Sequence, residues 1–362
     1  MKRIAVRIFV LVSLLMVALP QMQAAHSSDG GVDVEEIVLG HMGDAYDWHV
    51  TTYNHHHISI PLPIIVRSEQ TGEWHCFSSA EMQHALENGA TDYKGFYFNE
   101  DHNGKIYEKM PDGSTVRPWD FSITKNVAQI WIVVFIMIPV IVGCARWYKK
   151  NDTKERVPGG FVGMMEMLIM SINDDIIKSS IGEKHYRRYS PYLLTVFFFI
   201  FLTNLMGLLP VFPGGASVTG NINITFFLAI CTMLAINLFG NKEYWKEIFW
   251  PDVPIFLKAY PLPIMPVIEL FGVLTKPFAL MIRLFANMMA GHAIILSFAS
   301  IIFISWQISV AIGSGMTILS FFMMLFMNCM EFLVAFIQAY VFTMLSSVFI
   351  GMAHPEHDSH KA

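Results

Sequence analysis

The side chains best suited to do chemistry lie in a long apolar stretch, Leu262 to Gly351. The only charged residues within it are Glu269, Lys276, Arg283 and Glu331. So low a charge density does not suit a surface in water, and it indicates a segment that lies in lipid. A charge inside such a segment costs on the order of 3 kcal/mol to insert, so a retained charge marks a functional site. Arg283 is the strongest such residue.

Helix geometry groups several polar and small residues around Arg283. Asn287 lies one turn along from Arg283, and Ala286 and Ala290 flank the same stripe. Small residues at these positions permit the close approach of another helix. His292 is nine positions beyond Arg283, which places it about 180° round the helix. Arg283 and His292 are therefore predicted to face different compartments.

A second group of polar residues lies on the last apolar segment. Glu331 and Gln338 are seven positions apart, so they line one helix face at about 20° from each other. His292 and Glu331 both titrate and can bond one another across helices, whereas Arg283 stays protonated at any physiological pH. One fixed charge beside two exchangeable groups predicts proton handling rather than the binding of an organic solute.

The composition and the apolar segments set the class of protein. Of 362 residues, 54% are apolar and 15% are charged, whereas soluble domains carry about a quarter of charged residues. Three segments have close to the length of a bilayer span: Val127–Ala145, Tyr189–Phe212 and Ile222–Gly240. The stretch from Leu262 to Gly351 suits either two long tilted helices or three ordinary spans, and Gly313-Ser314-Gly315 is its best turn signal.

A further apolar segment, Phe161 to Ile181, suits an interfacial helix, because Asn173, Asp174 and Asp175 follow its apolar part. The predicted fold class is an all-α integral membrane protein with about five transmembrane or strongly tilted helices plus this interfacial helix. A small N-terminal exported domain of β character completes it. The membrane domain is predicted over residues 126–354, and residues 355–362 form a cytoplasmic tail.

The N-terminal part is predicted to be exported. Residues 1–25 have the basic start, the apolar run and the small residues of a signal peptide. An uncleaved anchor is the alternative, but the apolar run is shorter than the roughly 20 residues of a spanning helix. Residues 26–125 are polar, and Gly95–Met110 is typical of a hairpin around the Asn103-Gly104 turn, with a second turn at Asp112-Gly113.

Basic residues predict the orientation of the chain in the membrane. One cluster follows the first apolar segment and another precedes the second, which assigns that side to the cytoplasm by the positive-inside rule. The two clusters are Arg146, Lys149, Lys150, Lys154 and Arg156, and Lys184, Arg187 and Arg188. The chain is therefore predicted to cross the cell inner membrane several times, with the N-terminal domain exported and the C-terminus cytoplasmic.

No metal, cofactor or nucleic acid is predicted as a ligand. The histidines of residues 26–125, among them His55, His56 and His57, lack the cysteine pairing or the fixed helix spacing of a metal site. A net charge of −5 without a basic stripe does not favour nucleic acid. The sequence contains no phosphate loop of the Gly-x-x-x-x-Gly-Lys type, so nucleotide chemistry would belong to partner proteins.

Taken together, these motifs resemble one known family. The segment from Leu274 to His292 contains Arg-Leu-Phe-Ala-Asn followed by Ala-Gly-His, Glu331 and Gln338 follow on the next helix, and Asn204-Leu205-Met206-Gly207 precedes them. This combination resembles subunit a of the F-type ATP synthases, the membrane stator beside a rotating c-ring. The resemblance covers roughly Phe121 to His354.

The resemblance implies a role for each of these residues. Arg283 would be the stator arginine at the rotor interface, with Asn287 and Gln338 near it. His292 and Glu331 would belong to the proton half-channel from the exported side. Two further polar positions of the family pattern are weaker candidates, Glu269 and Asn204.

The resemblance also implies an architecture and a set of partners. Two long tilted helices would fill the last apolar stretch. The implied partners are c-ring subunits with a membrane carboxylate, the peripheral stalk subunit b, the lipid bilayer and, indirectly, the catalytic head; the chain would not be an enzyme on its own. The resemblance says nothing of the exported domain, and the long separation of Arg283 from Glu331 suggests an insertion at the turn near Gly313.

The sequence also allows other interpretations of these residues. Arg283 could form a structural ion pair with a carboxylate such as Glu269, and Glu269 and Lys276 could simply lie near a membrane interface. A self-contained proton-coupled secondary transporter is the alternative function, and an assembly or anchoring protein is a third class. A transporter should move a solute when purified alone, whereas a stator subunit should co-purify with a small carboxylate-bearing ring protein.

The predicted orientation can be tested by cysteine labelling of intact cells. An impermeant thiol reagent should label Ser28→Cys, in the exported part, and should leave Lys154→Cys, in the cytoplasmic loop, unlabelled until the cells are opened. Equal labelling of the two positions in intact cells would contradict this topology.

Overall fold

The computed structural model describes residues 43–53, 56–99, 104–151, 157–209, 214–250 and 264–353. The predicted signal peptide at 1–25 and the predicted tail at 355–362 lie outside these ranges. The described residues fall into two compact units. The first contains the described residues up to Val133, those of Leu205–Val218 and those of Met289–Phe332, and the second contains the described residues of Val134–Asn204, of Thr219–Met288 and from Leu333 onward.

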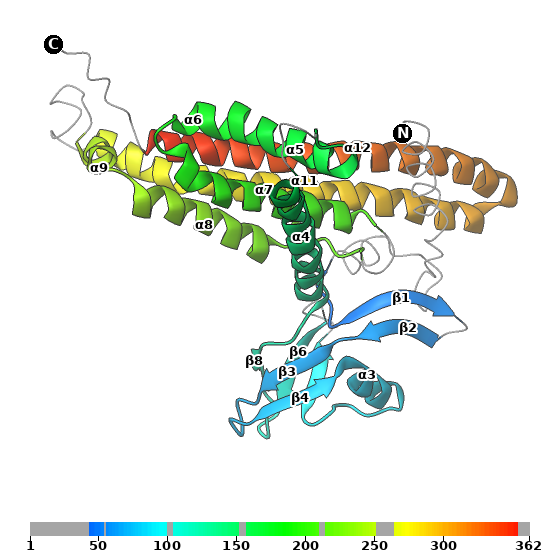
Figure 1. Ribbon diagram of the computed structural model, residues 1–362. Helices are drawn as coiled ribbons and strands as arrows, with labels where there is room; N and C mark the ends of the chain where they lie inside the picture. Colours follow the sequence, from blue (N-terminus) through cyan, green and yellow to red (C-terminus); the bar gives the residue numbers. More distant parts are fainter. Residues whose placement is uncertain are drawn as a thin grey trace, which may run out of the picture. The chain divides into compact units, whose positions relative to one another are not determined.

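The N-terminal part of the first unit is a small β domain, defined here as the described residues of 43–124 (Figure 1). Its three antiparallel sheets pair β1 with β2, β3 with β4 and β8, and β6 with β5 and β7. The strands are β1 (Asp47–Tyr53), β2 (His56–Pro61), β3 (Pro63–Arg67), β4 (Trp74–Ser78), β5 (Phe96–Asn99), β6 (Lys105–Lys109), β7 (Thr115–Val116) and β8 (Trp119–Asp120), and α3 (Ser79–Glu87) follows β4.

The predicted hairpin within this β domain is confirmed. In β5 and β6, Phe98 pairs with Ile106, and Gly104 has a φ of 65°, which glycine adopts without strain. Gly113 likewise has a φ of 78° in the turn that leads to β7. Alternating strand residues point inward and form one apolar core together with Met82 of α3 and Tyr46, which precedes β1. The strand residues of this core are Ile64, Val66, Phe77, Phe96 and Ile106.

Five helices are long and apolar enough to cross a membrane among the described residues. They are α4 (Lys125–Lys150), α7 (Tyr186–Gly207), α8 (Ile222–Phe239), α11 (Ile264–Ile308) and α12 (Val310–Met352). Their outward side chains are large and apolar; Phe135 of α4 and Phe227 of α8, for example, are 68% and 67% exposed. Such surfaces need lipid or another apolar partner, so the predicted class of integral membrane protein is confirmed.

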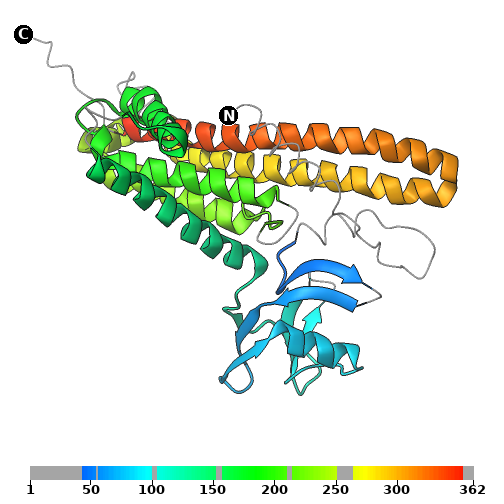
Figure 2. The ribbon, with the colours of Figure 1, turned by 45° about the vertical axis from the view of Figure 1, so that its right-hand side comes forward.

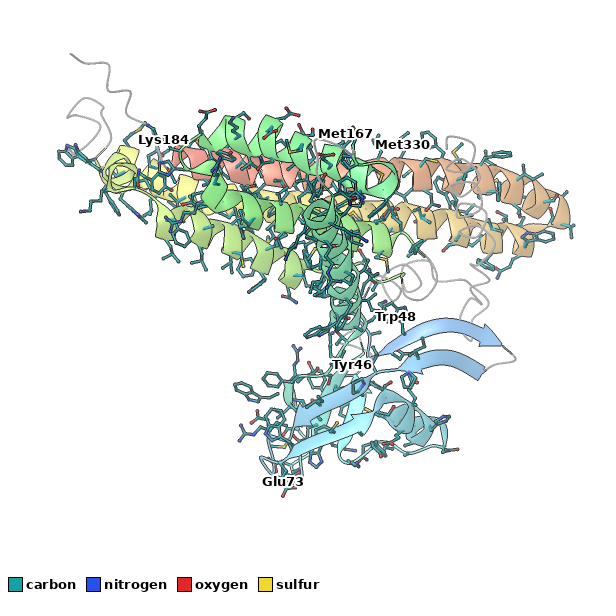
Figure 3. The ribbon with its side chains drawn as sticks, viewed as in Figure 1. Tyr46, Trp48, Glu73, Met167, Lys184 and Met330 are labelled. Atoms are coloured by element: carbon teal, nitrogen blue, oxygen red, sulfur yellow. The ribbon has the colours of Figure 1, made fainter. Side chains whose placement is uncertain are left out.

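A shorter helical run lies at the predicted interfacial segment. It consists of α5 (Gly160–Met170), a π-helical stretch η2 (Ser171–Lys178) and α6 (Ser179–Ile181). Met167 of α5 is exposed (Figure 3), whereas Ile172, Ile176 and Ile177 of η2 are buried in the core of the second unit. The segment is therefore helical, as predicted, and it has one exposed and one buried side. The short helix α9 (Lys242–Phe249) follows α8.

The last apolar stretch forms two long helices, α11 and α12, which lie side by side (Figure 2). Of the two predicted alternatives, two long helices are therefore confirmed, and three ordinary spans are excluded. The predicted turn at Gly313-Ser314-Gly315 is wrong, because the break between the helices is at Ser309, and Gly313 lies inside α12. The predicted end of the second span at Phe212 also differs, because α7 ends at Gly207.

Gly313 serves close packing instead of a turn. A Cβ atom on Gly313 would lie 2.9 to 3.0 Å from atoms of Trp306 on α11. Trp306 Nε1 also donates a hydrogen bond of 3.0 Å to Thr317 Oγ1 of α12. The absence of a side chain at Gly313 thus leaves room for the indole ring of Trp306 where α11 and α12 meet.

Replacement of Gly313 should therefore weaken the packing of α11 against α12. We expect Gly313→Ala to destabilise the protein by about 1 to 3 kcal/mol, because the added methyl group overpacks the contact with Trp306. Gly315→Ala is the matched control, since a Cβ at Gly315 meets nothing within 4 Å. The midpoint of thermal unfolding in one detergent measures the difference, and equal midpoints for the two variants would contradict this packing.

Candidate functional site

Near Arg283, α11 has one buried and one exposed face. The buried face consists of Leu280, Met281, Leu284 and Met288, each 4% exposed or less. Arg283 and Asn287 lie on the opposite, exposed face, one turn apart, with the small residues Ala286 and Ala290 exposed beside them. The predicted polar spot among small residues therefore lies on the outside of this chain, where a second helix can approach closely.

Arg283 does not depend on Glu269 for its charge balance. The two residues are fourteen positions apart on the same continuous helix, which corresponds to about 21 Å. This distance is far beyond that of an ion pair, so the structural pairing considered above does not form. Arg283 thus presents its guanidinium group on the exposed face of α11.

His292 and Glu331 are brought into direct contact from α11 and α12. His292 Nδ1 and Glu331 Oε1 are 2.5 Å apart. The side chain of Glu331 is 2% exposed and that of His292 is 16% exposed. The sequence predicted that these two residues could bond across helices, and the structure confirms this contact.

The other ring nitrogen of His292 contacts the end of α7. His292 Nε2 lies 3.3 Å from the backbone carbonyl oxygen of Gly207. Because a carbonyl oxygen can only accept a hydrogen bond, this contact assigns a hydrogen to Nε2. The contact between Nδ1 and Glu331 then needs one further proton, carried either by the ring or by the carboxyl group. With one proton between these two atoms, the pair has no net charge, whichever of the two groups carries it.

Two glycines make this arrangement possible. A Cβ on Gly291 would lie 3.0 Å from Glu331 Oε1 and 3.1 Å from its carboxyl carbon. A Cβ on Gly207 would lie 3.3 Å from the carbonyl oxygen of Ala216 and 3.8 Å from His292 Nε2. Both glycines let polar groups approach a helix backbone closely.

Three other predicted residues have separate surroundings. Gln338 of α12 is 6% exposed, and the expectation that it lies near Arg283 stays a prediction. Asn204 of α7 is fully buried, and its Oδ1 accepts a hydrogen bond of 2.5 Å from Thr219 Oγ1, just before α8. Asn204 therefore holds the start of α8 against α7.

Glu269 lies at the end of the second unit that contains α9. Burial raises the pKa of Tyr244 in α9, and the nearby charge of Glu269 adds to this effect. Tyr244 in turn donates a hydrogen bond of 3.3 Å to Asn237 Oδ1. This position agrees with the alternative that Glu269 lies near an interface.

Sequence reasoning missed the residues that support the pair through the backbone. Gly207 was noted only as part of a motif, because the sequence does not reveal which carbonyl faces His292. Gly291 directly precedes His292, which was a usable signal for close approach of another helix. Gln129, an amide in the apolar α4, is 0% exposed and was also missed.

Fold and site together define a multi-pass membrane protein with a fixed cation on an exposed helix face and a histidine–glutamate contact inside. The sequence profile described as "ATP synthase A chain" matches residues 127–351. The chain belongs to this family of ATP synthase membrane subunits. A second profile, described as a domain of unknown function, matches residues 37–121 and so covers the β domain.

Individual relatives agree with this assignment. The chain is 41% identical over 275 residues to the ATP synthase subunit a of Chlorobium phaeobacteroides, which covers 72% of this chain and 75% of that protein. It is 39% identical to ATP synthase subunit a 2 of Chlorobaculum tepidum, over 77% of this chain and 74% of that protein. It is 38% identical to ATP synthase subunit a of Anaeromyxobacter dehalogenans, over 70% and 64% of the two chains.

Proposed function

We infer that this chain is the proton-translocating stator subunit in the membrane sector of an F-type ATP synthase, and that it is not an enzyme on its own. Family membership carries this conclusion, and the separation of an exposed Arg283 from a buried His292–Glu331 pair supports it. A self-contained secondary transporter is not favoured, because the relatives are subunits of a larger complex by name.

The exposed face of α11 is the proposed contact with the c-ring. A carboxyl group on the ring must be neutral to face lipid, because a bare charge there is costly. Beside the guanidinium group of Arg283 the same carboxyl group can ionise and release its proton. The small residues Ala286 and Ala290 allow the ring helix to come close enough for this effect. Asn287 and Gln338 are proposed to contribute polar contacts near this interface.

The buried His292–Glu331 pair is the proposed relay of one half-channel. A proton that arrives at the pair displaces the shared proton, so the pair passes on a proton without ever carrying a lasting net charge. The fixed charge of Arg283 repels protons and prevents a direct leak between this half-channel and the one to the opposite side. Rotation of the ring then becomes the route by which a proton completes the crossing.

The predicted orientation decides on which side of the membrane the partner subunits bind. We propose that the β domain lies on the exported side, that the basic loops face the cytoplasm, and that the peripheral stalk subunit b and the catalytic head bind on the cytoplasmic side. A potential of 100 mV supplies about 2.3 kcal/mol per proton, so several protons must pass for each ATP that is made.

The role of Arg283 can be tested in the assembled complex. We expect Arg283→Ala to abolish ATP-driven proton pumping, and Arg283→Lys to impair it badly, because an ammonium group can lose its proton and lacks the planar fork of the guanidinium group. Lys276→Gln is a matched control two turns away on α11, and it should pump at a rate close to that of the parent protein. Co-purification of the ring protein shows whether each variant assembles, and normal pumping by Arg283→Lys would overturn the mechanism.

The role of the pair can be tested by exchanging its members. His292→Ala and Glu331→Ala should each slow proton flux strongly, because each leaves a buried polar partner unsatisfied. The double exchange His292→Glu with Glu331→His should recover more flux than the more damaging single exchange, since it restores one acid and one imidazole in contact.

Flux in reconstituted vesicles is compared across the parent protein, the two single exchanges and the double exchange. Contacting residues typically couple by about 0.5 to 3 kcal/mol in such a cycle. Strictly additive losses would show that His292 and Glu331 do not act on the same proton path.

A further inference from the structure

The described residues between α7 and α8, 208–209 and 214–221, are called the loop here, and they fold back onto the end of α7. Gly215 N and Leu209 N both donate to the carbonyl oxygen of Met206, over 3.3 and 3.2 Å. A Cβ on Gly214 would overlap both Leu209 and that carbonyl group, so the backbone packs tightly here. The loop therefore lies against the turn of α7 that carries Gly207.

Gly207 in turn lies between this loop and His292. A Cβ on Gly207 would come within 3.3 Å of the carbonyl oxygen of Ala216, and the carbonyl oxygen of Gly207 faces His292 Nε2. A displacement of the loop at Ala216 would therefore change the space in which the end of α7 meets the imidazole ring.

Two buried side chains from elsewhere in the first unit hold this loop. Trp48 Nε1 donates a hydrogen bond of 3.1 Å to the carbonyl oxygen of Gly214. Gln129 Oε1 accepts one of 2.9 Å from the amide of Ala216. Trp48 is 4% exposed and belongs to β1, whereas Gln129 is 0% exposed and lies near the start of α4.

The segment that carries Trp48 is itself fixed to the rest of the β domain and to α4. Tyr46 donates its phenolic hydrogen to Asp120, and burial, together with that carboxylate, raises the pKa of Tyr46, which keeps it a donor. The amide of Lys125, at the start of α4, donates to the carbonyl oxygen of Ala45 over 2.9 Å. Tyr46 and Trp48 lie together at the start of β1 in Figure 3.

This fixation distinguishes Trp48 from the other tryptophans of the β domain. Trp74 and Trp119 are 58% and 60% exposed, and their rings lie on the surface. Trp48 is instead buried, with its indole N–H bonded to a backbone carbonyl of the membrane loop.

We propose that the β domain, through Trp48, positions the loop that holds the Gly207 carbonyl against His292 and so tunes proton exchange by the His292–Glu331 pair. This inference rests on the proposed function of that pair. Trp48 and Gln129 are positioning residues, because neither contacts the shared proton. The β domain is thereby a structural component of the proton path rather than an appended domain.

The physical reason is that the proton of the pair depends on the hydrogen bond between His292 Nε2 and the backbone carbonyl oxygen of Gly207. Glu331 of α12 is the titratable group in contact with His292, and Gly207 of α7 supplies the backbone acceptor at 3.3 Å. A hydrogen bond weakens steeply with distance and angle, so a small shift of the loop changes how readily the ring holds its proton. The pH at which the pair works should change with it.

The test compares Trp48→Phe with Trp119→Phe in the assembled complex in vesicles. Both variants keep an aromatic ring, but only the first removes a donor to the loop. The rate of ATP synthesis, driven by a fixed potassium diffusion potential, is measured as the pH on the proton-donating side is varied. We expect Trp48→Phe to shift the midpoint of this profile by about half a pH unit or more, and Trp119→Phe to match the parent protein.

Hydrogen exchange of the Ala216 amide, measured on the same preparations, reports whether the loop is released. Faster exchange in Trp48→Phe together with a shifted profile supports the inference. Faster exchange with a profile that coincides with that of Trp119→Phe overturns it, and so does unchanged exchange, because Trp48 would then not hold the loop. Gln129→Leu, which removes the second bond, should shift the midpoint in the same direction if Trp48→Phe proves too unstable to assemble.

Different results would refute the proposed function of the pair and the positioning role of the β domain. Normal flux in His292→Ala would refute the proposed function of the pair, whatever the result for Trp48. Loss of flux in His292→Ala with identical profiles for Trp48→Phe and Trp119→Phe would refute only the positioning role of the β domain.

Discussion

A charged group is costly in a medium of low dielectric constant unless it is neutralised or screened, and the polar residues of α11 and α12 follow this constraint. Arg283 cannot lose its charge, and it lies on the exposed face of its helix among small residues. Glu331 is buried and contacts the largely buried His292, so a single proton between the two would leave their site without net charge. The permanent charge thus lies on an exposed helix face, whereas the groups that can exchange a proton lie inside.

Close backbone approach makes the buried site possible. Gly291 leaves room for the Glu331 carboxyl group, and Gly207 leaves room for Ala216 and the imidazole ring. At the other end of α12, a Cβ on Gly351 would collide with the carbonyl oxygen of Ser180, so a glycine is required where α12 meets α6. Small residues at helix contacts are the usual means of packing in lipid, where water gives no hydrophobic drive to association.

The sequence was sufficient to predict the membrane class, because apolar runs of bilayer length are a strong signal; α4 and α8 lie close to their predicted ranges. Helix periodicity also separated the face of Arg283 from that of His292. The turn at Gly313 was predicted wrongly, because a glycine can serve either a turn or a close contact, and only the position of Trp306 distinguishes these. The partners Gly207, Trp48 and Gln129 could not be predicted, since each acts on or through a backbone group whose position depends on tertiary contacts.

The length of α11 has an electrical consequence. A helix of 45 residues is about 67 Å long, so within a hydrocarbon layer of about 30 Å it must lie at about 60° from the membrane normal. Because the voltage falls with depth and not along the helix axis, each residue then crosses only about 0.7 Å of the field. Arg283 and Asn287, one turn apart, therefore lie at nearly equal potential. A charge that moves from Arg283 to Asn287 crosses only about 3 Å of a layer about 30 Å thick, so about a tenth of the membrane voltage acts on it.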